Sequence, residues 1–269
     1  MVTLSAFADE ISADLTEQIT VLEREGIRNI DLRSVWGKGV LDLDYREQDM
    51  IQFALDQNEF DISSIGSPIG KVAIDGDFGV HMERYKRAIE MAHLFGCDYI
   101  RLFSFYMPEG KDPADYRDEV MRRFQVMADL AQEEGVVLLH ENERGIYGDT
   151  AERCKDLIDT IDSPSLRVVF DPANFITVGQ HPYERCLPIL KDDIERFHIK
   201  DAIFSSGEVK PAGEGEGQIP RMLSEMIADG FEGFLSIEPH LLREDKKQAF
   251  HTAASALKKI LRDIGVAYD

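Results

Sequence analysis

The stretch RVVFDPANFITVG, from Arg167 to Gly179, combines the signals that decide the fold. Its Val-Val-Phe run is typical of a buried strand, and the run ends at a carboxylate, Asp171. Pro172 disfavours a helical backbone at the residue before it, so Asp171 is expected to stay extended at the strand tip. A single strand-terminal Asp most often caps the turn that follows. Whether Asp171 caps a turn or binds an ion therefore depends on the other strand ends of the chain.

Short β-rich runs alternate with amphipathic helical runs along the whole sequence. The expected strands cover residues 4–7, 29–33, 61–66, 99–105, 136–141, 167–171, 196–201 and 234–238. The expected helices cover about 14–25, 44–57, 80–95, 113–134, 149–160, 182–190, 218–229 and 243–264. Glycines that suit left-handed helix ends follow four of these helices: Gly26, Gly96, Gly135 and Gly230.

Eight strand-then-helix units without a linker predict an α/β fold, a single (β/α)8 TIM barrel domain that spans residues 1–269. The alternative, a doubly wound dinucleotide-binding sheet, is disfavoured because no GxGxxG motif follows the first strand. Hydrophobic residues make up 43% of the chain, which is enough for one large core.

The overall composition excludes several classes of function. The formal net charge of −21 argues against nucleic acid and anionic membranes as partners. No apolar run approaches the roughly 18 residues that span a membrane, and the N-terminus lacks the basic start of a signal peptide, so a cytoplasmic location is expected. The cysteines, Cys97, Cys154 and Cys186, form no CxxC motif and are expected to be buried thiols.

The candidate chemistry collects at the strand ends, which form the active face of a barrel of this kind. Strand five ends at Glu141, strand six at Asp171 and strand eight at Glu238, while strand seven carries His198. Each residue alone favours a cap, a salt bridge or a core role, but their coincidence on four consecutive strands favours a metal site. Three carboxylates and an imidazole suit one divalent cation, Mn²⁺ or Mg²⁺ first, with Co²⁺ or Zn²⁺ as alternatives.

Several polar residues near the same strand ends are candidate substrate contacts. The basic candidates would suit an anionic substrate, a phosphate or a carboxylate, and the alternative is that they neutralise the carboxylates or seal the barrel floor. The loop PAGEGEG, residues 211–217, is expected to be a flexible loop beside the site. The candidate substrate-binding residues are Arg33, Ser67, Lys71, Arg101, Asn174, Lys200 and His240.

At these residues the sequence resembles the xylose isomerase-like sugar isomerases and epimerases, a family that includes tagatose and psicose 3-epimerases, inosose dehydratase and hydroxypyruvate isomerase, and more distantly endonuclease IV. The resemblance covers essentially the whole chain. It rests on five motifs in a fixed order: LLHENE, VVFDPANF, RFHIKD, PAGEGEG and LSIEPHL.

The resemblance implies a barrel with one divalent cation held by Glu141, Asp171, His198 and Glu238, with Glu141 and Glu238 as catalytic acid and base. It also implies a homo-oligomer. Many members have a histidine three residues after the Asp, where this chain has Asn174. An amide cannot supply a proton at neutral pH, so Asn174 is expected to orient the substrate or a metal-bound water rather than to move a proton.

The expected function is therefore a metal-dependent isomerase or epimerase of a small polyhydroxy carbonyl compound: a sugar, sugar phosphate or keto-polyol. Proton abstraction next to the carbonyl would give an enediolate, and the sequence does not choose between epimerisation and isomerisation. A dehydratase of the inosose or dehydroshikimate type shares this chemistry and is the alternative. A third hypothesis is a non-catalytic sugar-binding barrel.

Overall fold

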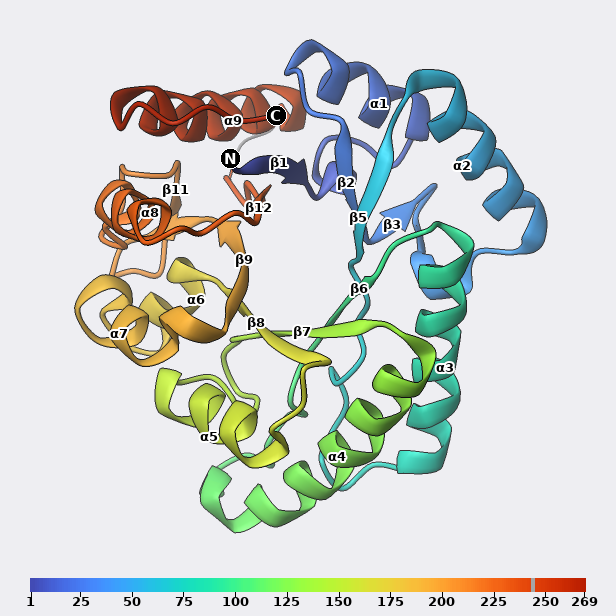
Figure 1. Cartoon of the computed structure of the whole chain (residues 1–269), viewed down its shortest axis with the longest axis vertical. Coiled ribbons are helices and arrows are strands. Elements are labelled where there is room, and N and C mark those ends of the chain that lie inside the picture. Colours follow the sequence, from blue (N-terminus) through green and yellow to red (C-terminus); the bar gives the residue numbers. More distant parts are fainter. Residues whose placement is uncertain (243–244) are drawn as a thin grey trace.

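A computed structural model describes residues 1–242 and 245–269. Eight parallel strands close into a barrel in the order β1-β12-β9-β8-β7-β6-β5-β2, and helices surround it (Figure 1). This confirms the expected (β/α)8 TIM barrel. The barrel strands are β1 (Thr3–Ala6), β2 (Asn29–Leu32), β5 (Asp61–Ile65), β6 (Tyr99–Leu102), β7 (Val137–Glu141), β8 (Leu166–Phe170), β9 (Ile194–Ile199) and β12 (Phe234–Ile237).

The helices match the amphipathic runs of the sequence to within a few residues. The long helices are α1 (Leu15–Arg24), α2 (Tyr45–Asn58), α3 (Phe78–Leu94), α4 (Arg117–Glu134), α5 (Ala151–Ile161), α8 (Ile219–Ala228) and α9 (Lys246–Asp263). Two short helices, α6 (Pro172–Thr177) and α7 (Leu187–Leu190), follow β8. Two-stranded sheets pair β3 (Ser34–Val35) with β4 (Lys38–Gly39) and β10 (Asp201–Ala202) with β11 (Val209–Lys210).

The structure differs from the expected helices in two places. The single helix expected at 182–190 is instead a π-helical turn, Pro182–Cys186, that runs into α7. The helix expected from residue 243 begins at Lys246, and residues 243–244 lie outside the described part of the chain. Over the described residues, no helix combines the length and apolar character needed to cross a membrane.

Helix α6 was not predicted, and it begins directly at the strand tip. Asp171 is its N-cap: the backbone is extended, at φ −109° and ψ 107°, and the side chain accepts a hydrogen bond from the Asn174 backbone N–H. Pro172 occupies the first helical turn, where its missing N–H costs nothing. The capping role considered for Asp171 from the sequence is therefore confirmed, and its second carboxylate oxygen, Oδ2, takes no part in the cap.

A glycine fixes the loop that follows β5. Gly70 has a φ of +87°, and a Cβ at this position would lie 1.8 Å from the carbonyl oxygen of Phe103. Only glycine allows this close approach of two backbones. The contact holds the neighbouring Lys71 beside the end of β6, at the mouth of the barrel.

The barrel floor is closed by a buried ion pair rather than by aliphatic side chains alone. Arg196 in β9 pairs with Asp31 in β2, and the two residues are 1% and 0% exposed. Serine hydroxyls from neighbouring strands complete the network: those of Ser5, Ser63 and Ser64 contact Asp31, and that of Ser236 accepts a hydrogen bond from Arg196. This layer lies directly below His198, since Arg196 and His198 are two residues apart on one strand.

A buried histidine outside the barrel predicts a pH dependence of stability. His81 in α3 packs against Phe78 and Phe105, and burial together with the nearby Arg123 charge lowers the pKa of His81 to about 4. The unfolded chain binds this proton near pH 6.5, so stability present above that pH is lost as the pH falls toward 4. The free energy of unfolding should fall in both proteins when the pH is lowered from 7 to 4.5. We expect this fall to be roughly 2–3 kcal/mol smaller in the His81→Leu variant than in the wild type.

Urea unfolding of both proteins at the two pH values measures this difference directly. Because each protein is compared with itself at the two pH values, the effect of the substitution on packing cancels. Parallel pH profiles for the wild type and His81→Leu would contradict the assignment of this acid sensitivity to His81.

Candidate active site and metal centre

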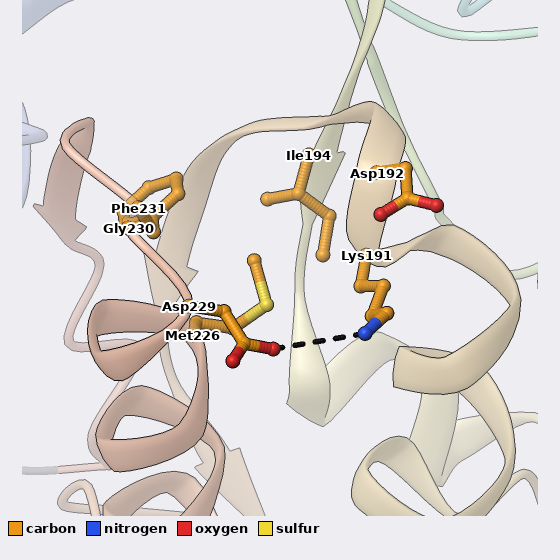
Figure 2. A pocket seen from close by; sticks show the side chains of 7 residues that line it. All are labelled: Lys191, Asp192, Ile194, Met226, Asp229, Gly230 and Phe231. Carbon is orange, nitrogen blue, oxygen red and sulfur yellow. Dashed lines mark ion pairs between the residues drawn. The ribbon is translucent and has the colours of Figure 1, made fainter.

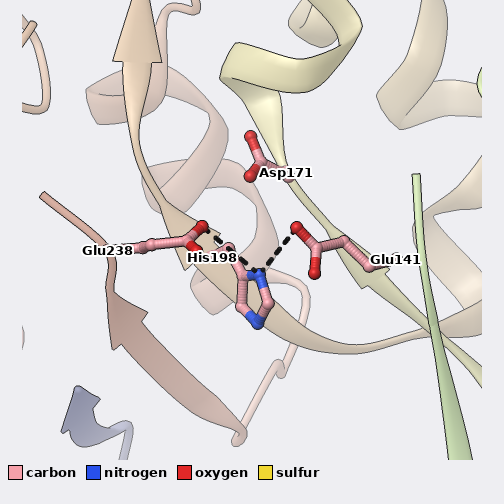
Figure 3. A group of neighbouring side chains, drawn as sticks. All are labelled: Glu141, Asp171, His198 and Glu238. Carbon is pink, nitrogen blue, oxygen red and sulfur yellow. Dashed lines mark ion pairs between the residues drawn. The ribbon is translucent and has the colours of Figure 1, made fainter. Parts of the chain in front are cut away.

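Four side chains from four consecutive barrel strands meet at the carboxyl ends of the strands. Glu141 ends β7, Asp171 follows β8, His198 lies in β9 and Glu238 follows β12, and their side chains point toward one another (Figure 3). One ligand-type atom from each residue lies within 4.8 Å of the others. None of the four residues is more than 2% exposed. The convergence expected from strand periodicity is therefore present.

Each carboxylate has one oxygen held by a fixed partner outside the cluster. Glu141 Oε2 lies 3.3 Å from Arg101 Nη1, and Glu238 Oε1 lies 3.1 Å from Arg33 Nη1. Asp171 Oδ1 accepts from the Asn174 N–H at 2.9 Å. Such outer partners orient a ligand and leave its other oxygen directed inward.

The inward atoms are incompletely satisfied within the protein. His198 Nδ1 lies 3.2 Å from Glu141 Oε1 and 3.9 Å from Glu238 Oε2 and forms a hydrogen bond with neither. Asp171 Oδ2 is also buried and makes no hydrogen bond of acceptable geometry, although the Lys200 ammonium lies 2.8 Å from it. Buried polar atoms without partners are costly. A divalent cation among these oxygens and this nitrogen would satisfy them, so the residues fit a metal ion.

Lys200 places a positive charge beside the cluster. Its Nζ atom lies 2.8 Å from Asp171 Oδ2 and 2.8 Å from Glu238 Oε2, the inward oxygens of those two residues. Burial alone would lower the pKa of Lys200, but the charges of Asp171 and Glu238 have the larger effect. The pKa of Lys200 is therefore raised, and the ammonium stays charged. Lys200 thus neutralises the same oxygens that a metal ion would use.

The pKa values of the carboxylates follow from their neighbours. Burial raises the pKa of Asp171 to about 6, because the nearby carboxylates add to the effect of burial and the Lys200 ammonium only partly opposes it. Burial alone would also raise the pKa of Glu141, but the charges of His198 and Arg101 have the larger effect. The pKa of Glu141 is therefore lowered, to about 2. The pKa of Glu238 is lowered well below its ordinary value because Lys200 and His240 outweigh burial.

Asn174, where the chain departs from many family members, contacts Glu141 rather than standing free. Its Nδ2 atom donates to Glu141 Oε1 at 3.2 Å and to the Asn142 carbonyl at 2.9 Å. Asn142, which the sequence reasoning missed, exchanges two 3.0 Å hydrogen bonds with the backbone of Asp171. Together the two amides tie the end of β7 to the end of β8, which fixes the distance between two of the four ligands.

A cavity of about 400 Å³ opens above the cluster. Six of the seven candidate substrate contacts line it: Arg33, Lys71, Arg101, Asn174, Lys200 and His240. Ser67 does not; it is fully buried, and its hydroxyl donates to the Arg101 carbonyl at 2.5 Å. Its place in the structure is that of a support for the β6 backbone.

A family model described as xylose isomerase-like TIM barrel matches residues 21–260. The chain belongs to this family. The resemblance drawn from the five motifs is thereby confirmed, and the motifs carry all four members of the cluster.

Individual relatives of this xylose isomerase-like barrel are distant. The 3-dehydroshikimate dehydratase of Bacillus anthracis is 19% identical over 213 residues, 76% of this chain and 75% of that protein. The two curated relatives that match are aligned over 59% and 75% of their own lengths.

Two solved structures illustrate the shared fold. The IolI protein, solved with a bound zinc atom, superposes with a TM-score of 0.80 at 17% identity, over 98% of this chain and 99% of that one. A D-tagatose 3-epimerase-like protein superposes with a TM-score of 0.78 at 18% identity, over 98% of this chain and 100% of that one.

The structure adds cavity residues that the sequence reasoning did not single out. Glu143, Arg144, Thr177 and Val209 also line the cavity. Glu143 pairs with Lys71 at 2.6 Å. Asp9 and Glu10 hold Arg33 from outside the lining, at 2.7 and 3.1 Å. The strand-end rule could have found Asp9 and Glu10, since both follow β1 within four residues.

The PAGEGEG loop is held in place rather than free. The carboxylate of Asp201 accepts hydrogen bonds from the backbone N–H groups of Gly213, Gly215 and Gly217, at 2.8 to 3.1 Å. A Cβ at residue 215 would lie 2.4 Å from Asp201 Oδ1. The glycines therefore allow the loop to wrap around a buried carboxylate, and the expectation of a flexible loop is wrong in this respect.

A second cavity, of about 430 Å³, lies at the opposite end of the barrel, between α8 and the start of β9 (Figure 2). It is lined by Lys191, Asp192, Ile194, Met226, Asp229, Gly230 and Phe231. Lys191 and Asp229 pair across it at 3.6 Å. No residue of the four-member cluster lines this cavity, so the candidate metal site lies at the other end.

Proposed function

We propose that this chain is a divalent-metal-dependent isomerase or epimerase of a small sugar, sugar phosphate or keto-polyol, acting by proton abstraction next to a carbonyl. The observation that carries the proposal is the pair Glu141 and Glu238. Both line one cavity, and both belong to the cluster that fits a cation. They come from strands separated by two others around the barrel. Two carboxylates so placed can reach one bound substrate from different sides.

The metal ligands would be Glu141, Asp171, His198 and Glu238. An oxygen-rich set of this kind suits Mn²⁺ or Mg²⁺, with Zn²⁺ and Co²⁺ as alternatives. The ion would act as a Lewis acid and stabilise the negative charge that develops on the substrate oxygen.

The proton transfers belong to the two glutamates. Both are held ionised by neighbouring positive charges, Glu141 by Arg101 and Glu238 by Lys200, so either can accept the α-proton at a carboxylate oxygen. Return of a proton to the opposite face of the same carbon is epimerisation, and return to the neighbouring carbon is isomerisation. Asn174 positions Glu141 and takes no part as an acid, because its amide does not ionise.

A dehydratase is the second candidate, favoured by the similarity to the 3-dehydroshikimate dehydratase of Bacillus anthracis. The same proton abstraction followed by loss of a β-hydroxyl would give an unsaturated product. A non-catalytic sugar-binding barrel is the least favoured reading, because a binding protein has no need to hold three buried carboxylates together.

The test is proton exchange in deuterated water. The protein is loaded with Mn²⁺ and incubated with a panel of ketoses and keto-acids, and loss of the α-proton signal is followed by NMR. We expect exchange with at least one compound, and new ultraviolet absorbance on turnover would select the dehydratase instead. The absence of both, together with no stoichiometric divalent cation by metal analysis, would favour the non-catalytic barrel.

Lys200 provides a separate prediction about the metal site. Since its ammonium contacts the inward oxygens of Asp171 and Glu238, the Lys200→Met variant is expected to bind Mn²⁺ about tenfold more tightly or better. The metal-free variant should also melt at a lower temperature, because two buried carboxylates lose their counter-ion.

Calorimetric titration with Mn²⁺ and thermal unfolding without metal check these two effects. The matched control is Lys71→Met, which removes a lysine of the same cavity that pairs with Glu143 outside the cluster. Equal Mn²⁺ affinity of Lys200→Met and Lys71→Met would show that Lys200 does not compete with the ion.

A further inference from the structure

The lining of the cavity above the cluster is rich in basic side chains, although the whole protein is acidic. The chain has a net charge of −21, yet five Lys and Arg side chains and His240 line the cavity against three glutamates. The lining is therefore a concentrated set of cations on an acidic protein.

Most of these cations are neutralised by carboxylates that the structure already provides. Arg33 is paired with Asp9, Glu10 and Glu238, and Arg101 with Glu141. Lys200 is paired with Asp171 and Glu238, and Lys71 with Glu143. The protein alone is thus close to charge balance around the cavity, and a divalent cation in the cluster would make the balance positive.

Aromatic rings hold three of the cations along one wall. The guanidinium carbons of Arg33 and Arg101 lie 4.8 and 4.9 Å from the centroid of the Phe7 ring. Lys71 Nζ lies 4.2 Å from the Phe103 ring centroid, and Arg101 also approaches that ring. Cation–π contacts at these distances fix the positions of charged groups without neutralising them.

Arg144 is the exception to the pairing. It lines the cavity, it is exposed, and it makes no hydrogen bond or ion pair with any residue in ranges 1–242 and 245–269. Its neighbour in sequence, Glu143, pairs with Lys71 at 2.6 Å, and Lys71 and Arg144 both line the cavity. An arginine with five free donors is well suited to a phosphate or carboxylate.

We infer that the substrate of this site carries an anionic group, a phosphate or a carboxylate, which Arg144 binds together with Lys71. The inference rests on the proposed function, which places the reacting carbon beside Glu141 and Glu238. A cavity of about 400 Å³ accommodates a small molecule with one such group. The anion offsets the positive charge that a bound cation adds.

The test compares pairs of related ligands of which one member carries an anionic group and the other does not. Calorimetry on the Mn²⁺-loaded protein measures binding of dihydroxyacetone phosphate against dihydroxyacetone, and of shikimate against methyl shikimate. We expect the anionic member of at least one pair to bind about tenfold more tightly or better than its neutral partner. The first pair reports a phosphate site and the second a carboxylate site.

The Arg144→Gln variant should weaken the preferred anionic ligand about tenfold and change the neutral partner less than about twofold. The control is Arg46→Gln, an exposed arginine at the start of α2, which changes net charge equally and should leave all affinities alone. Since Arg144 is exposed, its replacement is not expected to alter the melting temperature, which is measured alongside.

The outcomes separate this inference from the proposed function. Equal binding of charged and neutral partners, no binding of either anionic probe, or an anion preference that survives Arg144→Gln would overturn the inference. Proton exchange with neutral ketoses would still support the proposed function in those cases. An anion preference that depends on Arg144 in a protein that exchanges no α-protons would support the anion site and count against the isomerase.

Discussion

Replacing Glu238 with glutamine is expected to lower the rate of α-proton exchange by about 10³-fold or more and to weaken Mn²⁺ binding by at least about 100-fold. The substitution keeps the size of the side chain but removes the negative charge. It therefore replaces a charged metal ligand with a neutral one and removes one of the two proton-transfer groups at once. NMR exchange rates at saturating Mn²⁺ and calorimetric titration of the ion measure the two losses separately.

The matched control for metal binding is Glu143→Gln, a glutamate of the same cavity that pairs with Lys71 and stands outside the four-member cluster. Its Mn²⁺ affinity should stay within about threefold of the wild type, because it removes a charge further from the ion. Wild-type Mn²⁺ affinity and exchange in Glu238→Gln would remove Glu238 from the proposed site.

Replacing Arg196 with methionine is expected to lower the free energy of unfolding by roughly 3–5 kcal/mol. Asp31 is fully buried in the barrel floor, and Arg196 is the cation that pairs with it. Burial alone would raise the pKa of Asp31, but the Arg196 charge has the larger effect. The pKa of Asp31 is therefore lowered. Without Arg196, a buried carboxylate remains uncompensated, and urea unfolding at pH 7 measures the cost.

The double variant Arg196→Met with Asp31→Asn tests the cause of this loss. It removes both charges while an amide can still accept hydrogen bonds from the serines of the floor, so it should recover a large part of the lost stability. The Mn²⁺ affinity of the double variant should stay near that of the wild type, since the floor lies below the cluster. An unfolding free energy of Arg196→Met within about 1 kcal/mol of the wild type would contradict the role of the pair.

The strands and the four-member cluster were predictable because they depend on local and periodic signals. A strand such as β8 ends in an apolar run, Val168 to Phe170, that is fully buried, and a carboxylate follows its last residue. Glu141, Asp171 and Glu238 occupy that same position on their strands, and a barrel brings equivalent positions together. His198 followed from its spacing along β9.

Other features could not be predicted for equally physical reasons. Helix α6 has only six residues, too short for an amphipathic period to show. Arg101 was expected to neutralise carboxylates or close the floor, or else to bind substrate; the structure shows that it pairs with Glu141 and lines the cavity. Ser67 looked equally suitable as a substrate contact, but its hydroxyl is used by the backbone of a neighbouring strand.

The pattern of residues along the chain therefore specifies the barrel, the end of the barrel that holds the candidate site, and the residue types that meet there. Repetition of one strand-helix unit is enough to specify these. The tertiary structure alone decided which oxygen of each carboxylate faces inward and which cation lacks a partner. Those properties depend on side-chain contacts such as that between Arg33 and Glu238, which are 205 residues apart in sequence. Contacts of this kind form only when the sheet closes, and within ranges 1–242 and 245–269 they leave Arg144, which lines the cavity, without a counter-ion.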